Sequence, residues 1–390
     1  GIKMNFLAIS SEIATTILAM VILGIDLLMP KEKSRKCLGY ITVIGLVGVF
    51  IAIFNQYHLG NAPTFVQNLF IMDNLALLIK QMCLLAVGFT VLFSVDFVEK
   101  LPKHHGEFYV LILSALIGMM VMASANDFLT LFVGLELMAI SFYVLVGYAL
   151  KSSNSSEAGV KYLIVGSTSS AIMLYGVSLV YGTTGSIIFQ ELAANFALYS
   201  TAALVGILMV LIGFFFKMSI IPFHMWAPDI YQGAPTPITA LLATASKTAA
   251  VAALIRVLFM AFAIVKIYWL PVLILLSTLS MIGGNLMALR QTNVKRLLAY
   301  SSIAQAGYML IGIIAADAAG IKGVLFYTLI YIIANIGAFS VLIAVDKNYG
   351  EAEFSTIAGL GQRAPLLAAV LTISLLSMAG IPPMAGFVGK

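Results

Sequence analysis

The sequence predicts an all-α polytopic membrane protein, and three observations support this fold class. Of its 390 residues, 62% are hydrophobic and only 9% are charged, whereas a soluble domain carries about 25% charged residues. The mean hydropathy is +1.07. Apolar stretches long enough to cross ~30 Å of hydrocarbon recur along the whole chain. These features exclude a soluble enzyme, a disordered chain, a disulfide scaffold and a protein that binds nucleic acid.

Each crossing needs about 20 mostly apolar residues as a helix, and this rule defines the predicted spans. Glycine and proline interrupt several of them, which lipid-embedded backbone tolerates only inside protein or beside a cavity. The twelve predicted spans are 6–29, 38–55, 74–95, 108–126, 128–149, 159–181, 201–221, 237–263, 268–289, 297–315, 323–345 and 365–390.

The basic residues predict how these spans are oriented. With the N-terminus on the outer side, thirteen basic residues fall in cytoplasmic loops and three fall outside. This is the positive-inside pattern, and one miscounted span would remove it. We therefore expect a multi-pass protein of the cell inner (plasma) membrane, surrounded by lipid. Because the last span stops at Lys390 without a closing loop, we also expect an incomplete chain that lacks further helices.

Ionisable side chains inside the spans are the first candidates for function. A charge at the bilayer centre costs at least ~2.5–3.5 kcal/mol on insertion scales, so it needs a partner or a function. Glu136, Lys217 and Lys247 lie deep in spans five, seven and eight, which can meet in one bundle. These three residues are therefore the main candidates for a functional site.

Other charges in the spans have simpler interpretations. For two basic residues, snorkelling to the interface or a structural ion pair is favoured over a functional role. Two acids near the ends of the first span are either interfacial charges or functional groups. The four residues are Lys80, Arg256, Glu12 and Asp26.

Prolines accompany two of the lysines. Pro222 is predicted to end the helix a turn after Lys217, because proline lacks an N–H and clashes with the preceding turn. Lys390 lies eight residues after Pro382, in a span with the same kind of break. A broken helix frees carbonyl groups that can hold water or a cation.

Two polar residues follow the first break. His224 and Asp229 are candidates for carrying protons between bulk water and the buried lysines. For His224, the alternative of a loop histidine with satisfied hydrogen bonds is equally supported.

The two breaks also indicate an internal repeat. MSIIPF (218–223) aligns without gaps with MAGIPP (378–383), and ELMAISFYVLVGY resembles SSIAQAGYMLIGI (301–313). An odd number of helices in each copy inverts the second copy. We therefore predict two inverted five-helix repeats with broken helices 7 and 12. The predicted domains are three N-terminal helices in 1–100, a first antiporter-like repeat in 108–265 and a second, truncated repeat in 268–390.

These features predict a route for protons. Burial lowers the pKa of a lysine and a nearby carboxylate raises it. A movement of Glu136 towards or away from Lys217 would therefore switch this lysine between holding and releasing a proton. Lys217, Lys247 and Lys390, bridged by water, would then form a relay along the membrane midplane.

The sequence contains no recognisable motif that would bind a redox cofactor. There is no dinucleotide fingerprint, no cysteine cluster for iron–sulfur and no evident intramembrane histidine pair for haem. We therefore expect no cofactor and no metal in this chain, so that partners or another ion gradient supply the energy.

The chain resembles a known family in three stretches, GLELMAISFYVLVGY, FKMSIIPFHMWAPDIYQGAPTPITALLATASKTAA and GIPPMAGFVGK. They are similar to the antiporter-like subunits of respiratory complex I, the proton-pumping NADH–quinone oxidoreductase. The PDIYQGAPTP run most resembles the subunit N (subunit 2) branch, because the sister subunits and the Mrp-type antiporters differ there.

The resemblance implies roles and partners. Glu136 and Lys217 would form the modulating pair, Lys247 would relay and Lys390 would face the exit side. The chain would be a non-redox subunit of a translocase, next to other antiporter-like and small membrane-arm subunits. Two alternatives stay open: a stand-alone or Mrp-type cation/proton antiporter, and a purely structural membrane subunit.

Overall fold

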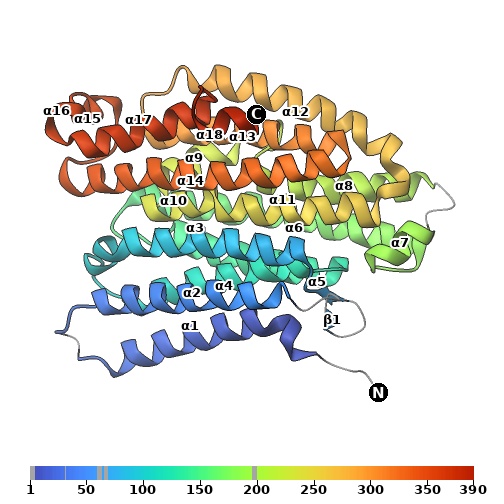
Figure 1. Cartoon of the computed structure of the whole chain (residues 1–390), viewed down its shortest axis with the longest axis horizontal. Coiled ribbons are helices and arrows are strands. Elements are labelled where there is room, and N and C mark those ends of the chain that lie inside the picture. Colours follow the sequence, from blue (N-terminus) through green and yellow to red (C-terminus); the bar gives the residue numbers. More distant parts are fainter. Residues whose placement is uncertain (1–4, 31, 59–63, 66–68, 196–199) are drawn as a thin grey trace. The chain divides into compact units, whose positions relative to one another are not determined.

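The computed structural model describes residues 5–30, 32–58, 64–65, 69–195 and 200–390, and most of them are helical. Figure 1 shows the course of the chain with its helices labelled. Two of the basic residues used for the orientation, Lys3 and Lys31, lie outside the described residues. The chain forms two compact units, of which unit 1 comprises 1–145, 163–214 and 248–269, and unit 2 comprises 146–162, 215–247 and 270–390.

Unit 1 is built on four N-terminal helices that pack as neighbours. Helix α1 packs against α2 and α4, and α3 also packs against α2 and α4. The described part of this unit also contains helices α5 and α7, parts of four more helices, a two-stranded antiparallel pair and three short helical turns. Its elements are η1 (Phe6–Ile9), α1 (Ser10–Leu28), α2 (Lys36–Gln56), β1 (Thr64–Phe65), β2 (Phe70–Ile71), α3 (Asn74–Glu99), α4 (His105–Ser124), α5 (Phe128–Val146), α7 (Phe189–Asn195), η2 (Val257–Ala261) and η3 (Ala263–Val265).

Unit 2 is organised around its longest helix, α14. This helix packs against α10, α13, α17 and α18, while α9 packs against α10 and α13. The elements wholly in this unit are α9 (Trp226–Gly233), α10 (Thr236–Ala243), α13 (Val294–Ala315), α14 (Ala318–Asn348), α15 (Phe354–Ile357), α16 (Leu360–Arg363), α17 (Pro365–Ala379) and α18 (Ala385–Gly389). Four helices pass from one unit into the other, namely α6 (Ser153–Thr184), α8 (Thr201–Met218), α11 (Ala245–Arg256) and α12 (Lys266–Ala288).

Eleven helical segments of the described chain are long and apolar enough to cross a membrane. They match the first eleven predicted spans, which confirms the all-α polytopic class. The predicted twelfth span, 365–390, contains a shorter apolar helix that ends at Ala379. It ends there because Gly380 adopts a left-handed conformation with φ of 79°, which suits glycine, and two prolines follow.

Two helix ends differ from the sequence prediction. Helix α8 ends at Met218, immediately after Lys217 and three residues before the predicted end at Ile221. The chain leaves the helix at Ser219, whose φ is 59°. Ile221 is also disfavoured in the helical region, because it precedes Pro222. The predicted span 237–263 is also interrupted, because Thr244 separates α10 from α11 and a π-turn follows Arg256.

Charged residues in unit 1 form the structural ion pairs that the sequence left open. Lys80 Nζ lies 2.6 Å from Glu12 Oε1, and both side chains are almost fully buried. The guanidinium of Arg256 makes a two-point contact with the Asp73 carboxylate at 2.5 and 2.9 Å. Its Nε also donates to the carbonyl of Ala123 at 2.8 Å. Ion pairing therefore replaces snorkelling as the explanation for Lys80 and Arg256.

The other acid of the first span, Asp26, also has a basic partner. Its carboxylate accepts a hydrogen bond at 2.8 Å from Nε of Arg35, in the loop that follows α1. Both side chains are largely buried. Asp26 thus ties the end of α1 to this loop through an ion pair.

Candidate functional site

The candidate site begins where α8 ends. Lys217 is the next-to-last residue of α8 and is 2% exposed, with its ammonium 5.6 Å from the centre of the Phe216 ring. Trp226, at the start of α9, donates its indole N–H to the carbonyl of Phe216 at 2.9 Å. The polypeptide that carries Lys217 is therefore pinned to the short helix that follows it.

His224 lies between these two helices and is 8% exposed. Its Nδ1 has no hydrogen-bond partner among the residues that the structure describes. Burial lowers the pKa of His224 below its usual value of 6.5, so the ring is neutral at pH 7. The choice between a proton carrier and a loop histidine with satisfied hydrogen bonds stays a prediction for His224.

Lys247 lies in the first turn of α11 and is 1% exposed. Its ammonium donates to the carbonyl of Ser302 at 2.8 Å and to the hydroxyl of Ser302 at 2.6 Å. The Ser302 hydroxyl in turn points to the hydroxyl of Tyr231 at 3.5 Å. Lys247 therefore begins a short line of hydroxyl groups that joins α11, α13 and α9.

A second polar group surrounds Gln305, one turn further along α13. The hydroxyl of Tyr327, on α14, donates to Gln305 Oε1. Gln305 Nε2 donates to the carbonyl of Met378 at 2.9 Å, and Lys390 Nζ donates to the same carbonyl at 2.7 Å. The Lys390 ammonium also lies 4.4 Å from the centre of the Tyr308 ring, although Lys390 as a whole residue is exposed.

Glu136 belongs to unit 1, where it lies on α5. Its Oε1 is buried and has no hydrogen-bond partner among the described residues. A buried carboxylate oxygen is costly unless it gains a partner or a proton. The pairing of Glu136 with Lys217 of unit 2 stays a prediction.

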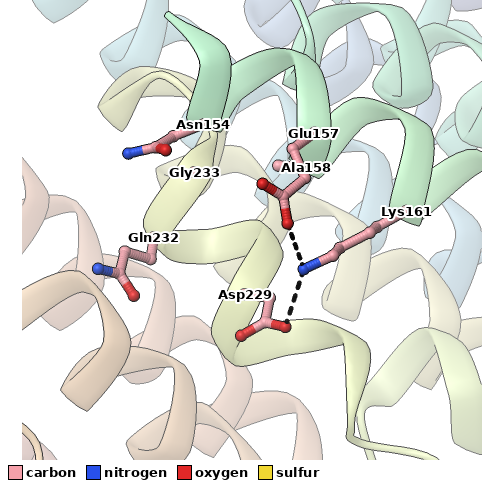
Figure 2. A pocket seen from close by; sticks show the side chains of 7 residues that line it. All are labelled: Asn154, Glu157, Ala158, Lys161, Asp229, Gln232 and Gly233. Carbon is pink, nitrogen blue, oxygen red and sulfur yellow. Dashed lines mark ion pairs between the residues drawn. The ribbon is translucent and has the colours of Figure 1, made fainter.

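A pocket of about 190 Å³ opens in unit 2 between the first turns of α6 and helix α9. Figure 2 shows Lys161 reaching between two carboxylates, with its Nζ 2.7 Å from Glu157 and 3.6 Å from Asp229. Arg296 contacts the other oxygen of Asp229 at 2.5 Å. Burial alone would raise the pKa of Asp229, but Arg296 and Lys161 outweigh it and hold that pKa below its usual range.

Asp229 is therefore ionised at neutral pH and ties α6 and α13 to α9 through two basic side chains. A carboxylate with a lowered pKa attracts protons but does not retain them at neutral pH. It is therefore suited to the entrance of a proton pathway and not to holding a proton within it. Within the described residues there is no group of three or more His, Cys, Asp or Glu side chains that could hold a metal ion.

Four polar residues of this region were not among the sequence-predicted candidates. All four are nearly fully buried: Ser302, Gln305, Tyr231 and Tyr327. Ser302 contacts Lys247 and Tyr231, whereas Tyr327 contacts Gln305, which shares the Met378 carbonyl with Lys390. A signal was present, because SSIAQ (301–305) places three polar side chains inside a predicted span. Uncharged polar groups cost less to bury than charges, so a search for charges overlooked them.

Comparison with known proteins places this chain among respiratory membrane proteins. The sequence profile of the family described as NADH:quinone oxidoreductase/Mrp antiporter, TM, matches residues 125–390. The chain is 49% identical over 388 residues to NADH-quinone oxidoreductase subunit N of Heliobacterium modesticaldum, covering 99% of this chain and 82% of that protein. The corresponding protein of Desulfitobacterium hafniense is 47% identical, with 98% and 81% covered.

Solved structures give the same result. A chain of respiratory complex I from Thermus thermophilus is 31% identical, with a TM-score of 0.81 over 97% of this chain and 80% of that one. A chain of the Mrp complex from a Dietzia species is 25% identical, with a TM-score of 0.83 over 97% and 73%.

Proposed function

The chain belongs to the NADH-quinone oxidoreductase subunit N family, and from this premise we propose that it moves protons across the membrane as a non-redox subunit of such an oxidoreductase. The partners would be adjacent antiporter-like and small membrane subunits, whose redox chemistry would drive the transport. The membrane would be the bacterial inner membrane, with the N-terminus on the outer side, as the charge asymmetry supports.

The observation that carries this proposal is the set of buried polar contacts in unit 2. Hydroxyl groups both donate and accept hydrogen bonds, so Ser302 and Tyr231 can pass a proton to or from Lys247. Lysine suits the role, because its pKa shifts readily when it is buried, whereas arginine stays charged. Glu136 would set the charge of Lys217, the first lysine of the relay, and Lys390 would receive the proton on the far side.

Proton uptake would begin at the pocket of Figure 2 and at His224. Asp229 is exposed to water there, and Tyr231 lies two residues further along α9 with its hydroxyl near Ser302. His224 is neutral and has a ring nitrogen without a partner in the described chain, so it can accept a proton.

The inverted repeat is part of the same proposal. Helices α8 and α17 end at Met218 and Ala379, within one residue of each other in the alignment of MSIIPF with MAGIPP. Each is followed by a short helix, α9 or α18. Transporters place their ion sites where such interrupted helices meet, because carbonyl groups are freed there. The Met378 carbonyl, bound by Lys390, supports this reading of the second copy.

A stand-alone or Mrp-type cation/proton antiporter is the second candidate. The likeness to the Mrp complex chain supports a shared fold, but its identity is 25%, against 49% for subunit N of Heliobacterium. We therefore prefer the subunit of a redox-driven pump over the antiporter.

Substitution of Lys247 tests this function in the assembled complex, reconstituted in vesicles with NADH and a quinone. Lys247→Ala should abolish most of this subunit's share of proton pumping per electron. Lys247→Arg should do the same, because it keeps the charge and cannot release the proton. The measurement is the ratio of protons moved to electrons transferred.

Lys295 provides a matched control in the same unit. It is also a buried lysine, 7% exposed, and it donates to a backbone carbonyl, that of Ala234, at 3.0 Å. Lys295→Ala should leave the ratio of protons to electrons near that of the wild type in whatever complex assembles. Full pumping by Lys247→Ala and Lys247→Arg would refute the proposed function.

A further inference from the structure

We propose that Gln305 is a gate that blocks proton transfer between the Lys247 group, which consists of Lys247, Ser302 and Tyr231, and Lys390. This inference rests on the proposed function. Gln305 lies on α13, three residues after Ser302, and is 4% exposed. Ser302 is bonded to Lys247, whereas Gln305 shares a carbonyl with Lys390. Gln305 therefore lies one turn along α13 from the residue that binds Lys247, and it shares a hydrogen-bond acceptor with Lys390.

The chemistry of an amide makes Gln305 a barrier. A hydroxyl can take a proton on its oxygen and release its own, but an amide nitrogen does not give up a proton near neutral pH. Both ends of the Gln305 amide are also occupied. Its oxygen accepts from Tyr327 and its nitrogen donates to the Met378 carbonyl, so the amide is fixed in one orientation.

The shared carbonyl couples this gate to the last lysine. A carbonyl oxygen has two lone pairs, which here accept from Gln305 Nε2 and from Lys390 Nζ. A charged ammonium is the stronger donor, and it weakens when it loses its proton. The charge of Lys390 therefore determines how strongly the carbonyl is shared, and with it how firmly the Gln305 amide is held.

A simpler role would be to join helices, and the chain contains a second glutamine with hydrogen bonds of this kind. In unit 1, Tyr57 donates its hydroxyl to Gln81 Oε1 at 3.0 Å, and Gln81 Nε2 donates to the carbonyl of Phe50 at 3.3 Å. The arrangement is the same as at Gln305, and Gln81 is 6% exposed. No lysine is recorded on the Phe50 carbonyl in the described chain. Gln81 is therefore a matched control.

The test replaces the amide by a group of the same shape that can carry protons. In Gln305→Glu, one carboxyl oxygen accepts a proton while the other releases one towards Lys390, so the barrier becomes a conductor. The complete complex is reconstituted in vesicles without NADH, a pH gradient is imposed and its decay is followed. We expect Gln305→Glu to lose the gradient several-fold faster than the wild type, and Gln81→Glu to lose it at the wild-type rate.

Gln305→Met separates conduction from loss of packing. Methionine has a similar length and neither donates nor carries protons, so this variant should hold the gradient as well as the wild type. Equal leaks from Gln305→Met and Gln305→Glu would mean damaged packing, and would overturn the gate.

The gate and the relay can fail separately. If the Gln305→Glu complex holds the pH gradient as well as the wild type and Lys247→Ala stops pumping, the gate is rejected and the proposed function is retained. Normal pumping by Lys247→Ala would reject the relay, and the gate with it.

Discussion

At the scale of single residues, several charges of unit 1 are buried as ion pairs. Lys80 is fully buried and its ammonium has two neighbours, the Glu12 carboxylate at 2.6 Å and the Phe70 ring, whose centre is 5.0 Å away. Ser11 donates its hydroxyl to the second oxygen of Glu12 at 3.0 Å. Desolvation of the two ions offsets most of their attraction, so the pair gives little net stability. Removal of one partner alone is costly.

This asymmetry predicts a result for single and double variants. Lys80→Met should destabilise the protein by roughly 3–5 kcal/mol, because it leaves the Glu12 carboxylate buried without its cation. Adding Glu12→Gln should restore most of the loss, since no buried charge then remains. The apparent melting temperature of the purified complex is the measurement. A double variant as unstable as Lys80→Met would contradict the prediction.

Sequence reasoning at this scale was partly successful. It located Glu136, Lys217 and Lys247 inside spans, because a charge in an apolar stretch is visible without a structure. The partners of Lys80 and Arg256 could not be identified, because they lie 68 and 183 residues away along the chain. Only the packing of the helices brings such residues together.

At the scale of helices, small residues set the approach of α12 to α13. A Cβ added at Gly284 would lie 2.7 Å from the backbone N of Ala304 and 3.0 Å from the Tyr300 carbonyl oxygen. Backbone atoms cannot move aside as the end of a side chain can. This close contact brings together the two helices on which Ser302 and Gln305 depend, as small residues do in membrane helix pairs.

Gly284→Ala should therefore push α12 away from α13 and cost about 1–3 kcal/mol, as overpacking does. Gly323→Ala, on α14, is the control, because a Cβ there meets nothing within 4 Å. This control should cause no loss of stability, since alanine favours a helix more than glycine does. Thermal melting of the two variant complexes measures the difference. Equal losses would show that this contact is not what holds the helices.

The spans could be predicted from the sequence, but some helix boundaries could not. The apolar stretches predicted eleven spans correctly, because length and composition alone determine them. Helix α8 ends three residues before the predicted position, and the interruption just before Lys247 was not predicted. Ser219 leaves the helix before Pro222 can act, and no glycine or proline marks the interruption at Thr244. Both ends lie beside candidate site residues, where local preference commonly gives way to function.

At the scale of the whole molecule, the orientation in the membrane determines which way protons would move. The predicted threading places the loop after α1, with Lys33, Arg35 and Lys36, on the cytoplasmic side. The first cysteine, Cys37, is exposed and adjoins this loop, whereas Cys83 is buried within α3. The chain thus has one reactive marker near a basic loop and one protected thiol as an internal reference.

A membrane-impermeant maleimide should therefore modify Cys37 in inside-out vesicles and spare it in right-side-out spheroplasts. Cys83 should stay unmodified in both until the protein is denatured, because it is buried and the reagent cannot reach it. Mass spectrometry of the two cysteine peptides measures the labelling, and Cys37→Ser identifies any signal from another site. Labelling of Cys37 in spheroplasts would reverse the threading. The pocket with Asp229 would then face the outside and release protons instead of taking them up.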